Sequence, residues 1–282
     1  MKLLRDLLSS LVALAIAGAA QATTHSTDYT DLWWNSPDAS EDGWGVNVVQ
    51  QGDIVFATFF IYGADGTPRW YVAPSTGSLA APVGQNTFTG PLYSTTGTHF
   101  ALPWNPANRG FMQVGTVTFN FTAPLAGTMA YTIEGVQVVK NIKRQTWRTN
   151  NLAGRYFGGT VANGTNCGGG INNGPILING ELAIGHSIPA SGTSTLAMEV
   201  DFFGPQGQAA TCTYSATYRQ EGKMGSADGT FNCVIQNNSN PPFGTFALRE
   251  VQANPNGLTA KYTARDQFCD YSGFFGGPRD VL

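Results

Sequence analysis

The chain has 282 residues, only 12% of them charged, and a formal net charge of −3. The charged share is about half of that in typical soluble domains, and a mildly acidic chain has no electrostatic attraction for nucleic acid or for an anionic membrane surface. We therefore expect no nucleic-acid partner, and we expect the solvated faces to be covered by Thr, Asn, Gln, Ser and Gly.

The first 22 residues have the features of a secretory signal peptide. Lys2 and Arg5 precede an apolar run at 11–20, and A-Q-A at 20–22 is the small-x-small pattern that signal peptidase accepts. The run is well below the roughly 20 apolar residues needed to span a bilayer, and no later segment approaches that length. The sequence predicts an exported protein, periplasmic or extracellular, with no membrane insertion once residues 1–22 are removed.

Glycine and proline divide the rest of the chain into short runs rich in Val, Thr, Phe and Tyr. This pattern is typical of many short strands joined by turns. Gly52 in QQGD and Gly66 in YGADGTP can adopt the positive φ that tight hairpins require. The first half of the mature chain therefore predicts a meander of antiparallel strands. The expected strands are 44–50, 54–62, 69–73, 87–93, 114–122, 127–133 and 136–147.

Alternation within these runs indicates which faces are buried. In VGTVTFNFT, Val117, Phe119 and Phe121 share one face, which predicts a core on that side and water on the other. IVFATFF at 54–60 is apolar almost throughout. This predicts either a central strand buried on both sides or a strand whose outer face is covered by something else.

The composition changes around RTNNLAG at 148–154, which predicts a Trp-rich module at 28–149 and a Cys-containing module at 152–282. In the second module a small residue, any residue and an aromatic recur as a triplet. Residues two apart share a strand face, so each triplet places an aromatic ring beside the space left by a small residue on the same face. Such pairs can fill the interior of a tapering barrel. The triplets end at Tyr156, Tyr218, Phe231, Phe246, Tyr262 and Phe275.

The closing YSGFFGGPR echoes LAGRYFGG at the start of the second module, which predicts that its first and last strands meet. An open sandwich is the alternative. The expected fold class is all-β, with two consecutive antiparallel β modules built as meander sheets or small barrels.

All four cysteines lie in the second module, and an exported protein meets an oxidising environment. Four cysteines allow three connectivities. Cys212 and Cys233 lie in neighbouring strand-like runs, so we expect them to pair, which leaves Cys167 to pair with Cys269. The spacings contain no C-x-x-C and no matching histidine pair, so we expect no metal site.

Motifs for catalysis are scarce. The chain has no G-x-S-x-G, H-E-x-x-H or phosphate-binding glycine motif, and we expect no cofactor. His186 beside Ser187 is more typical of a surface loop than of a catalytic dyad. A pair of carboxylates would suffice for glycoside hydrolysis, and four acidic residues lie near the first tryptophans: Asp31, Asp38, Glu41 and Asp42.

Aromatic residues are concentrated near the start of the mature chain. Trp33, Trp34 and Trp44, with Trp70 and Tyr71 from a following strand, would meet if the N-terminal segment packs beside the first hairpins. Neighbours in an extended chain point opposite ways, so one member of each adjacent pair is expected inside and the other outside. These five are the candidate ligand-binding residues, because exposed rings stack on sugars and on other planar or aliphatic ligands.

The segment WWNSPDASEDGWGVNVVQQGDIVFATFFIYGADGTPRWYV resembles the W-W-N-P, G-W-G, Q-Q-G-D, F-A-T, Y-D-A-D-G, W-x-V string of a family of uncharacterised exported bacterial all-β proteins. LAGRYFGG, CTYSATYRQEGKMGSADGTFNC and YSGFFGGPR resemble the second module of that family. Ser36 is inserted between Asn35 and Pro37, and Gly63 replaces the usual Asp. The resemblance implies export and an all-β fold, and it implies no activity.

These observations favour a non-catalytic, exported binding or surface-interaction protein for a carbohydrate, an envelope component or a small amphipathic ligand. One alternative is a carboxylate-dependent polysaccharide hydrolase. Another is a structural or protein-binding partner, such as an inhibitor or an appendage component, whose partner is another exported protein.

Overall fold

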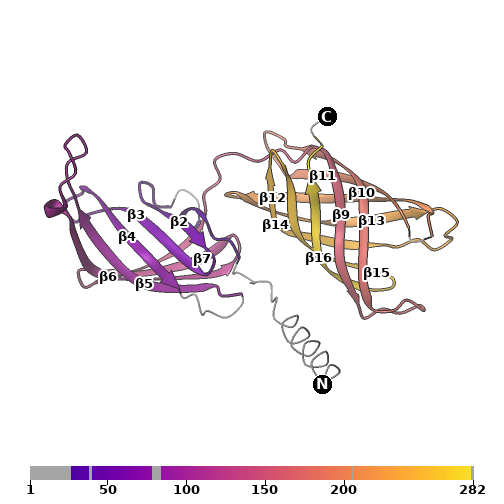
Figure 1. Ribbon diagram of the computed structural model, residues 1–282, viewed down its shortest axis with the longest axis horizontal. Coiled ribbons are helices and arrows are strands. Elements are labelled where there is room, and N and C mark those ends of the chain that lie inside the picture. The colour runs from indigo at the N-terminus through magenta and orange to yellow at the C-terminus, as the bar shows by residue number, and fades with distance from the viewer. Residues whose placement is uncertain (1–26, 38–39, 78–83, 205, 281–282) are drawn as a thin grey trace, which may run out of the picture.

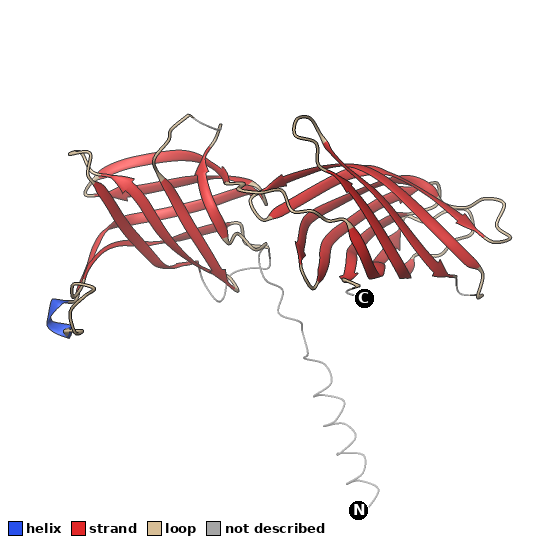
Figure 2. Cartoon of the chain, turned by 90° about the horizontal axis from the view of Figure 1, so that it is seen from above, coloured by secondary structure: helices blue, strands red, loops and turns tan. Residues whose placement is uncertain are grey.

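The computed structural model describes residues 27–37, 40–77, 84–204 and 206–280, and the expected signal peptide lies outside them. The described chain folds into two closed barrels of antiparallel strands (Figures 1 and 2). The all-β class is confirmed, and both modules are barrels. Within the described ranges, no helix has the length and apolar character required to cross a bilayer.

The first barrel covers residues 31–144, and each strand pairs with its sequence neighbour until β8 returns to β1 at the pair Trp33 and Arg144. One 3-10 helix, η1 (Pro106–Asn108), lies between β5 and β6. The strands are β1 (Asp31–Asn35), β2 (Gly45–Gln51), β3 (Ile54–Tyr62), β4 (Pro68–Gly77), β5 (Thr87–Thr96), β6 (Gly110–Ala123), β7 (Ala126–Ile133) and β8 (Val136–Arg144).

The second barrel covers residues 154–278, and β16 pairs with β9 from Asp270 opposite Thr165 to Gly276 opposite Gly159. The prediction that the first and last strands of this module meet is therefore confirmed. The strands are β9 (Gly154–Thr165), β10 (Gly174–Ser187), β11 (Ser194–Phe203), β12 (Ala209–Glu221), β13 (Met224–Ile235), β14 (Phe243–Asn254), β15 (Gly257–Asp266) and β16 (Asp270–Pro278).

The interior of the first barrel follows the period of two in its strands. Val117, Phe119 and Phe121 of β6 are buried, as the alternation predicts. Tyr29, just before β1, stacks on Phe121 with ring centroids 3.9 Å apart, and Trp33 lies 4.7 Å from the same ring. Aromatic side chains thus fill this small barrel near its closing seam.

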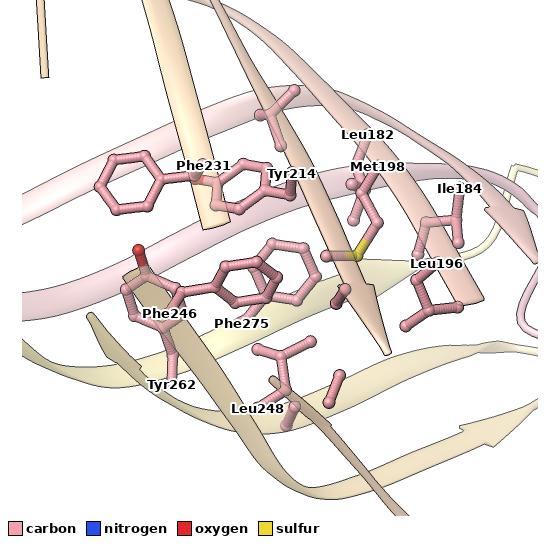
Figure 3. Packing of buried hydrophobic residues seen from close by; sticks show 14 of the residues in the cluster. Leu182, Ile184, Leu196, Met198, Tyr214, Phe231, Phe246, Leu248, Tyr262 and Phe275 are labelled. Carbon is pink, nitrogen blue, oxygen red and sulfur yellow. The ribbon is translucent and has the colours of Figure 1, made fainter. Parts of the chain in front are cut away.

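The interior of the second barrel is built from the small-x-aromatic triplets, and all six of their rings are buried. Figure 3 shows four of these rings: Phe231, Phe246, Tyr262 and Phe275. The register sets the ring of one strand opposite the gap of the next. Phe231 of β13 lies opposite Gly244 of β14, while Gly229 of β13 lies opposite Phe246 of β14. The same reciprocal arrangement joins β15 and β16. Each of these four rings therefore occupies space that the glycine or alanine opposite it leaves open.

Two disulfides close the second barrel, and both have the expected connectivity. Cys212 and Cys233 are register partners on β12 and β13, and their side chains are buried inside the barrel. Cys167 and Cys269 join the loop after β9 to the loop before β16 across 102 residues of sequence. These bonds indicate an oxidising, non-cytoplasmic compartment.

Candidate functional site

Trp33 and Trp34 point to opposite sides of β1. Trp33 is inside the first barrel with 1% of its surface exposed, and its Nε1 donates to the Tyr29 carbonyl over 2.9 Å. Its side chain is therefore not accessible to a ligand. Trp34 is half-buried on the other side, where its Nε1 donates to the Glu41 carbonyl over 3.1 Å.

Trp44 lies at the end of the first barrel, just before β2, and packs against the core from its rim. Its Nε1 donates to Glu41 Oε2 over 2.9 Å, and Lys140 Nζ lies 5.7 Å from its ring centroid. Lys140 Nζ also lies 2.5 Å from Glu41 Oε2. The bonds from Lys140 and then from Trp44 lower the pKa of Glu41. Glu41 therefore holds Trp44 through its carboxylate and Trp34 through its backbone carbonyl.

Trp70 and Tyr71 also separate, as adjacency in β4 predicts. Tyr71 is half-buried against the core, whereas 55% of the Trp70 surface is exposed on the outside of the barrel. Trp70 is the register partner of Phe60 on β3, and Phe60 is 52% exposed. The two rings are thus cross-strand neighbours that face solvent, at Cβ distances of roughly 5 Å.

Further exposed rings of β3 extend this surface along the strand. Phe56 and Tyr62 are outward-facing and exposed, and the half-buried Thr58 lies between Phe56 and Phe60. We call the set Phe56, Phe60, Tyr62 and Trp70 the aromatic face. The expectation that something covers the outer side of this apolar strand does not hold within the described chain, because these rings remain open to solvent.

The second barrel carries an open groove of about 570 Å³ on its outer surface. Gly159 and Gly276, two of its lining residues, are register partners with φ of 153° and 140°, a backbone region that favours glycine, and a Cβ at either would overlap the carbonyl oxygen of a neighbouring strand. Val161, Leu177 and Phe274 lie side by side on three neighbouring strands along it, all exposed. Neutral polar residues complete the lining: Asn179, Gln252, Asn254, Asn256 and Thr259.

The acidic residues near the tryptophans do not form a catalytic pair in the described chain. Asp31, at the start of β1, is bound to Arg144 at 3.1 Å, whereas Glu41 follows the other end of that strand. Asp42 is exposed, and Asp38 lies outside the described residues. The low pKa of Glu41 is opposite to what a general acid needs.

His186 has a structural role in the second barrel. Its Nδ1 accepts a hydrogen bond from the Leu152 N–H over 3.1 Å, and its ring meets Tyr218 edge-on at 4.9 Å. Burial lowers its pKa.

All four cysteines are in disulfides. Among the described residues, no group of three or more His, Cys, Asp or Glu side chains could hold a metal ion.

Sequence reasoning selected Trp70 but missed the other rings of the aromatic face. A signal for them was present, because positions 56, 60 and 62 share one face of a strand whose other face holds Val55, Ala57 and Phe59. Comparisons with family models, with curated proteins and with solved structures found no match to this chain.

Proposed function

We propose that this protein is an exported, non-catalytic binding protein whose aromatic face holds a neutral carbohydrate chain. The observation that carries the proposal is the cross-strand pair Phe60 and Trp70, each more than half exposed although apolar. Large apolar side chains at such exposure are typical of interaction sites when they gather in one patch.

The form of the surface favours a chain rather than a compact ligand. Phe56 and Phe60 are four residues apart on one strand, which separates them by roughly 13 Å. Tyr62 extends the row by two further residues, and Trp70 widens it across the strand. The rings stand on two paired strands, β3 and β4, so little backbone conformational entropy is lost on binding. A polysaccharide can contact several such rings in succession.

The chemistry of the surface favours a neutral ligand. Aromatic rings pack against the apolar faces of sugars, and a few aromatic anchors supply most of the energy at such surfaces. Between the rings lie the half-buried Thr58 and its register partner Asn47, which offer hydroxyl and amide groups. The charged side chains of the adjoining hairpin, Asp65 and Arg69, neutralise each other in an ion pair of 3.0 Å.

Residues 1–22 and the two disulfides support export to the periplasm or the exterior. The hydrolase alternative has less support, because Asp31 and Glu41 are bound to separate basic residues. An exported protein partner on the same aromatic face is the other alternative. The groove of the second barrel suits a neutral ligand as well, since no charged side chain is among its lining residues.

The test is affinity electrophoresis of the oxidised protein lacking residues 1–22 in gels that contain β-glucan, xylan or mannan. We expect one of these to retard the protein, and we expect Trp70→Ala and Phe60→Ala to weaken binding at least tenfold, which is about 1.4 kcal/mol. The matched control is Trp147→Ala, because Trp147 is 77% exposed outside the barrels. Its affinity should equal that of the unmodified protein.

Other outcomes would overturn the proposal. Absence of retardation in every gel would reject carbohydrate binding. Loss of binding in Phe274→Ala, with Trp70→Ala unaffected, would move the site to the groove of the second barrel. Capture of another exported protein that depends on Trp70, without any polysaccharide affinity, would favour the protein-partner alternative.

A further inference from the structure

The connection between β5 and β6 is a thirteen-residue loop, 97–109, that extends beyond the end of the first barrel and contains η1 (blue in Figure 2). We call it the apolar loop. Three of its large apolar side chains are open to solvent: Phe100 at 95% exposed, Leu102 at 62% and Trp104 at 67%. They lie within five residues of one another on a convex element rather than in a groove.

The apolar loop is ordered by its own hydrogen bonds. Thr98 Oγ1 accepts from the Asn105 N–H over 2.9 Å and donates to the Asn105 carbonyl over 3.0 Å. The Asn105 side chain in turn caps η1 by accepting from the Ala107 N–H over 3.0 Å. The exposed rings are therefore presented by a defined structure, and little ordering is required when they bind.

More than half of the backbone N–H groups of the apolar loop are hydrogen-bonded within the loop. The N–H groups at 101, 102, 105, 107, 108 and 109 all donate to acceptors within the loop. Positions 103 and 106 are prolines, which have no N–H. Unsatisfied backbone groups are costly in an apolar phase, and these six internal bonds lower that cost for the part of the loop from 101 to 109.

The charge of the apolar loop does not oppose its transfer from water to an apolar environment. No Asp or Glu occurs between Asp65 and Glu134, and the only fixed charge of the apolar loop is Arg109 at its end. The long side chain of Arg109 allows its guanidinium to stay in a polar layer while the apolar side chains of the loop enter an apolar one. The net negative charge of the whole chain gives no long-range attraction to anionic lipid, so binding would have to depend on apolar contact.

We propose that the apolar loop inserts into the interfacial region of a lipid bilayer, with Phe100, Leu102 and Trp104 as the inserting side chains. A bilayer accepts a convex apolar tip without a complementary groove, and aromatic side chains, Trp above all, favour the membrane–water interface. This contact is peripheral and involves no membrane-spanning segment, and it revises the expectation from sequence that the mature protein does not insert into a membrane. It uses residues separate from the aromatic face, so it goes beyond the proposed carbohydrate binding and does not depend on it.

The first experiment is co-sedimentation of the oxidised protein with phosphatidylcholine vesicles. We expect binding that changes less than twofold between 50 mM and 500 mM salt, since apolar insertion is weakly screened. The variant Phe100→Ser/Leu102→Ser/Trp104→Ser should bind at least tenfold more weakly. The matched control is Phe203→Ser, because Phe203 is 78% exposed at the end of β11 in the second barrel and should be irrelevant to lipid.

The second experiment locates the inserted side chain. Brominated phosphatidylcholine should quench tryptophan emission of the unmodified protein, and Trp104→Phe should bind with an affinity within threefold while losing most of the quenching. The proposal is overturned if the unmodified protein does not sediment with neutral vesicles, or if the triple serine variant sediments equally well. It is also overturned if binding requires anionic lipid. Trp70→Ala should retain vesicle binding, which separates this test from that of carbohydrate binding.

Discussion

The carboxylate of Asp31, in the first strand of one barrel, accepts a hydrogen bond of 2.8 Å from the backbone N–H of Lys223, in a hairpin turn of the other. The same oxygen lies 3.1 Å from Arg144 Nη1 at the closing seam of the first barrel. Lys223 Nζ reaches Asp28 at 2.5 Å. One carboxylate therefore links barrel closure to the contact between the barrels, and both should respond to changes around it.

Arg144→Met tests the importance of this link for the first barrel. The Arg144 side chain is fully buried, donates to three backbone carbonyls as well as to Asp31, and lies 4.9 Å from the Trp33 ring centroid. Methionine removes all these bonds and leaves a carboxylate without its buried partner. We expect the free energy of unfolding to fall by about 3–5 kcal/mol, measured by urea denaturation with tryptophan fluorescence.

The control for Arg144 is Arg69→Met, which breaks the exposed ion pair with Asp65 at 3.0 Å. Exposed pairs are screened by water and contribute little, so its urea midpoint should stay close to that of the unmodified protein. Equal effects of the two substitutions would contradict a special role for the buried link.

Gly222→Ala tests the contact between the barrels. Gly222 has φ of 58°, and a Cβ there would overlap the Asp31 carboxylate and Arg144. We expect the substitution to separate the turn from Asp31, to lower the melting temperature, and to speed proteolysis of the linker at 145–153. Gly207→Ala is the matched control, because Gly207 has φ of 78° and open space around it. It should show only the backbone strain of about 1–2 kcal/mol, without faster linker cleavage.

The features that could be predicted from sequence are those set by a period of two. Phe119 and Phe121 alternate with polar residues, and the small-x-aromatic triplets place their rings on the inner face of whichever strand contains them. The similarity of LAGRYFGG and YSGFFGGPR predicted that the strands containing these two segments pair and close the barrel. The glycines of the two segments meet across β9 and β16, as at Gly159 and Gly276.

The features that could not be predicted depend on register and on what covers a face. Phe60 became part of the candidate site only because it lies opposite Trp70, and this register is set by the β3–β4 hairpin and a bulge after Val55. A strand that is apolar almost throughout, such as IVFATFF, does not show from its sequence whether its outer side is buried. Trp33 illustrates the converse, because adjacency predicts one inner and one outer ring without indicating which is which.

Alkaline pH should destabilise the second barrel. Burial raises the pKa of Tyr214 to about 12 and that of Tyr218 to about 12, from an ordinary value of 10.0. Between these values the unfolded chain has lost a proton that the folded chain keeps, so the free energy of unfolding falls as pH rises from 10 to 12. Between pH 10 and pH 11, the free energy of unfolding of the Tyr214→Phe variant should fall by about 1 kcal/mol less than that of the unmodified protein. If the urea midpoints of the unmodified protein and of Tyr214→Phe fall equally with rising pH, ionisation of Tyr214 is not the cause of the destabilisation.

Removal of the Cys167–Cys269 disulfide should destabilise the second barrel more than the first. All six tryptophans lie at or before position 147, so tryptophan fluorescence reports the first barrel and the linker, while far-ultraviolet circular dichroism reports the strands of both barrels. The bond spans 102 residues, and Cys167→Ser/Cys269→Ser should lower the free energy of unfolding by about 4–5 kcal/mol. The circular-dichroism signal should then show a transition at lower urea that the tryptophan signal lacks. If both signals shift together by the same amount, the barrels unfold as one unit through the Asp31 link, and independent unfolding is ruled out.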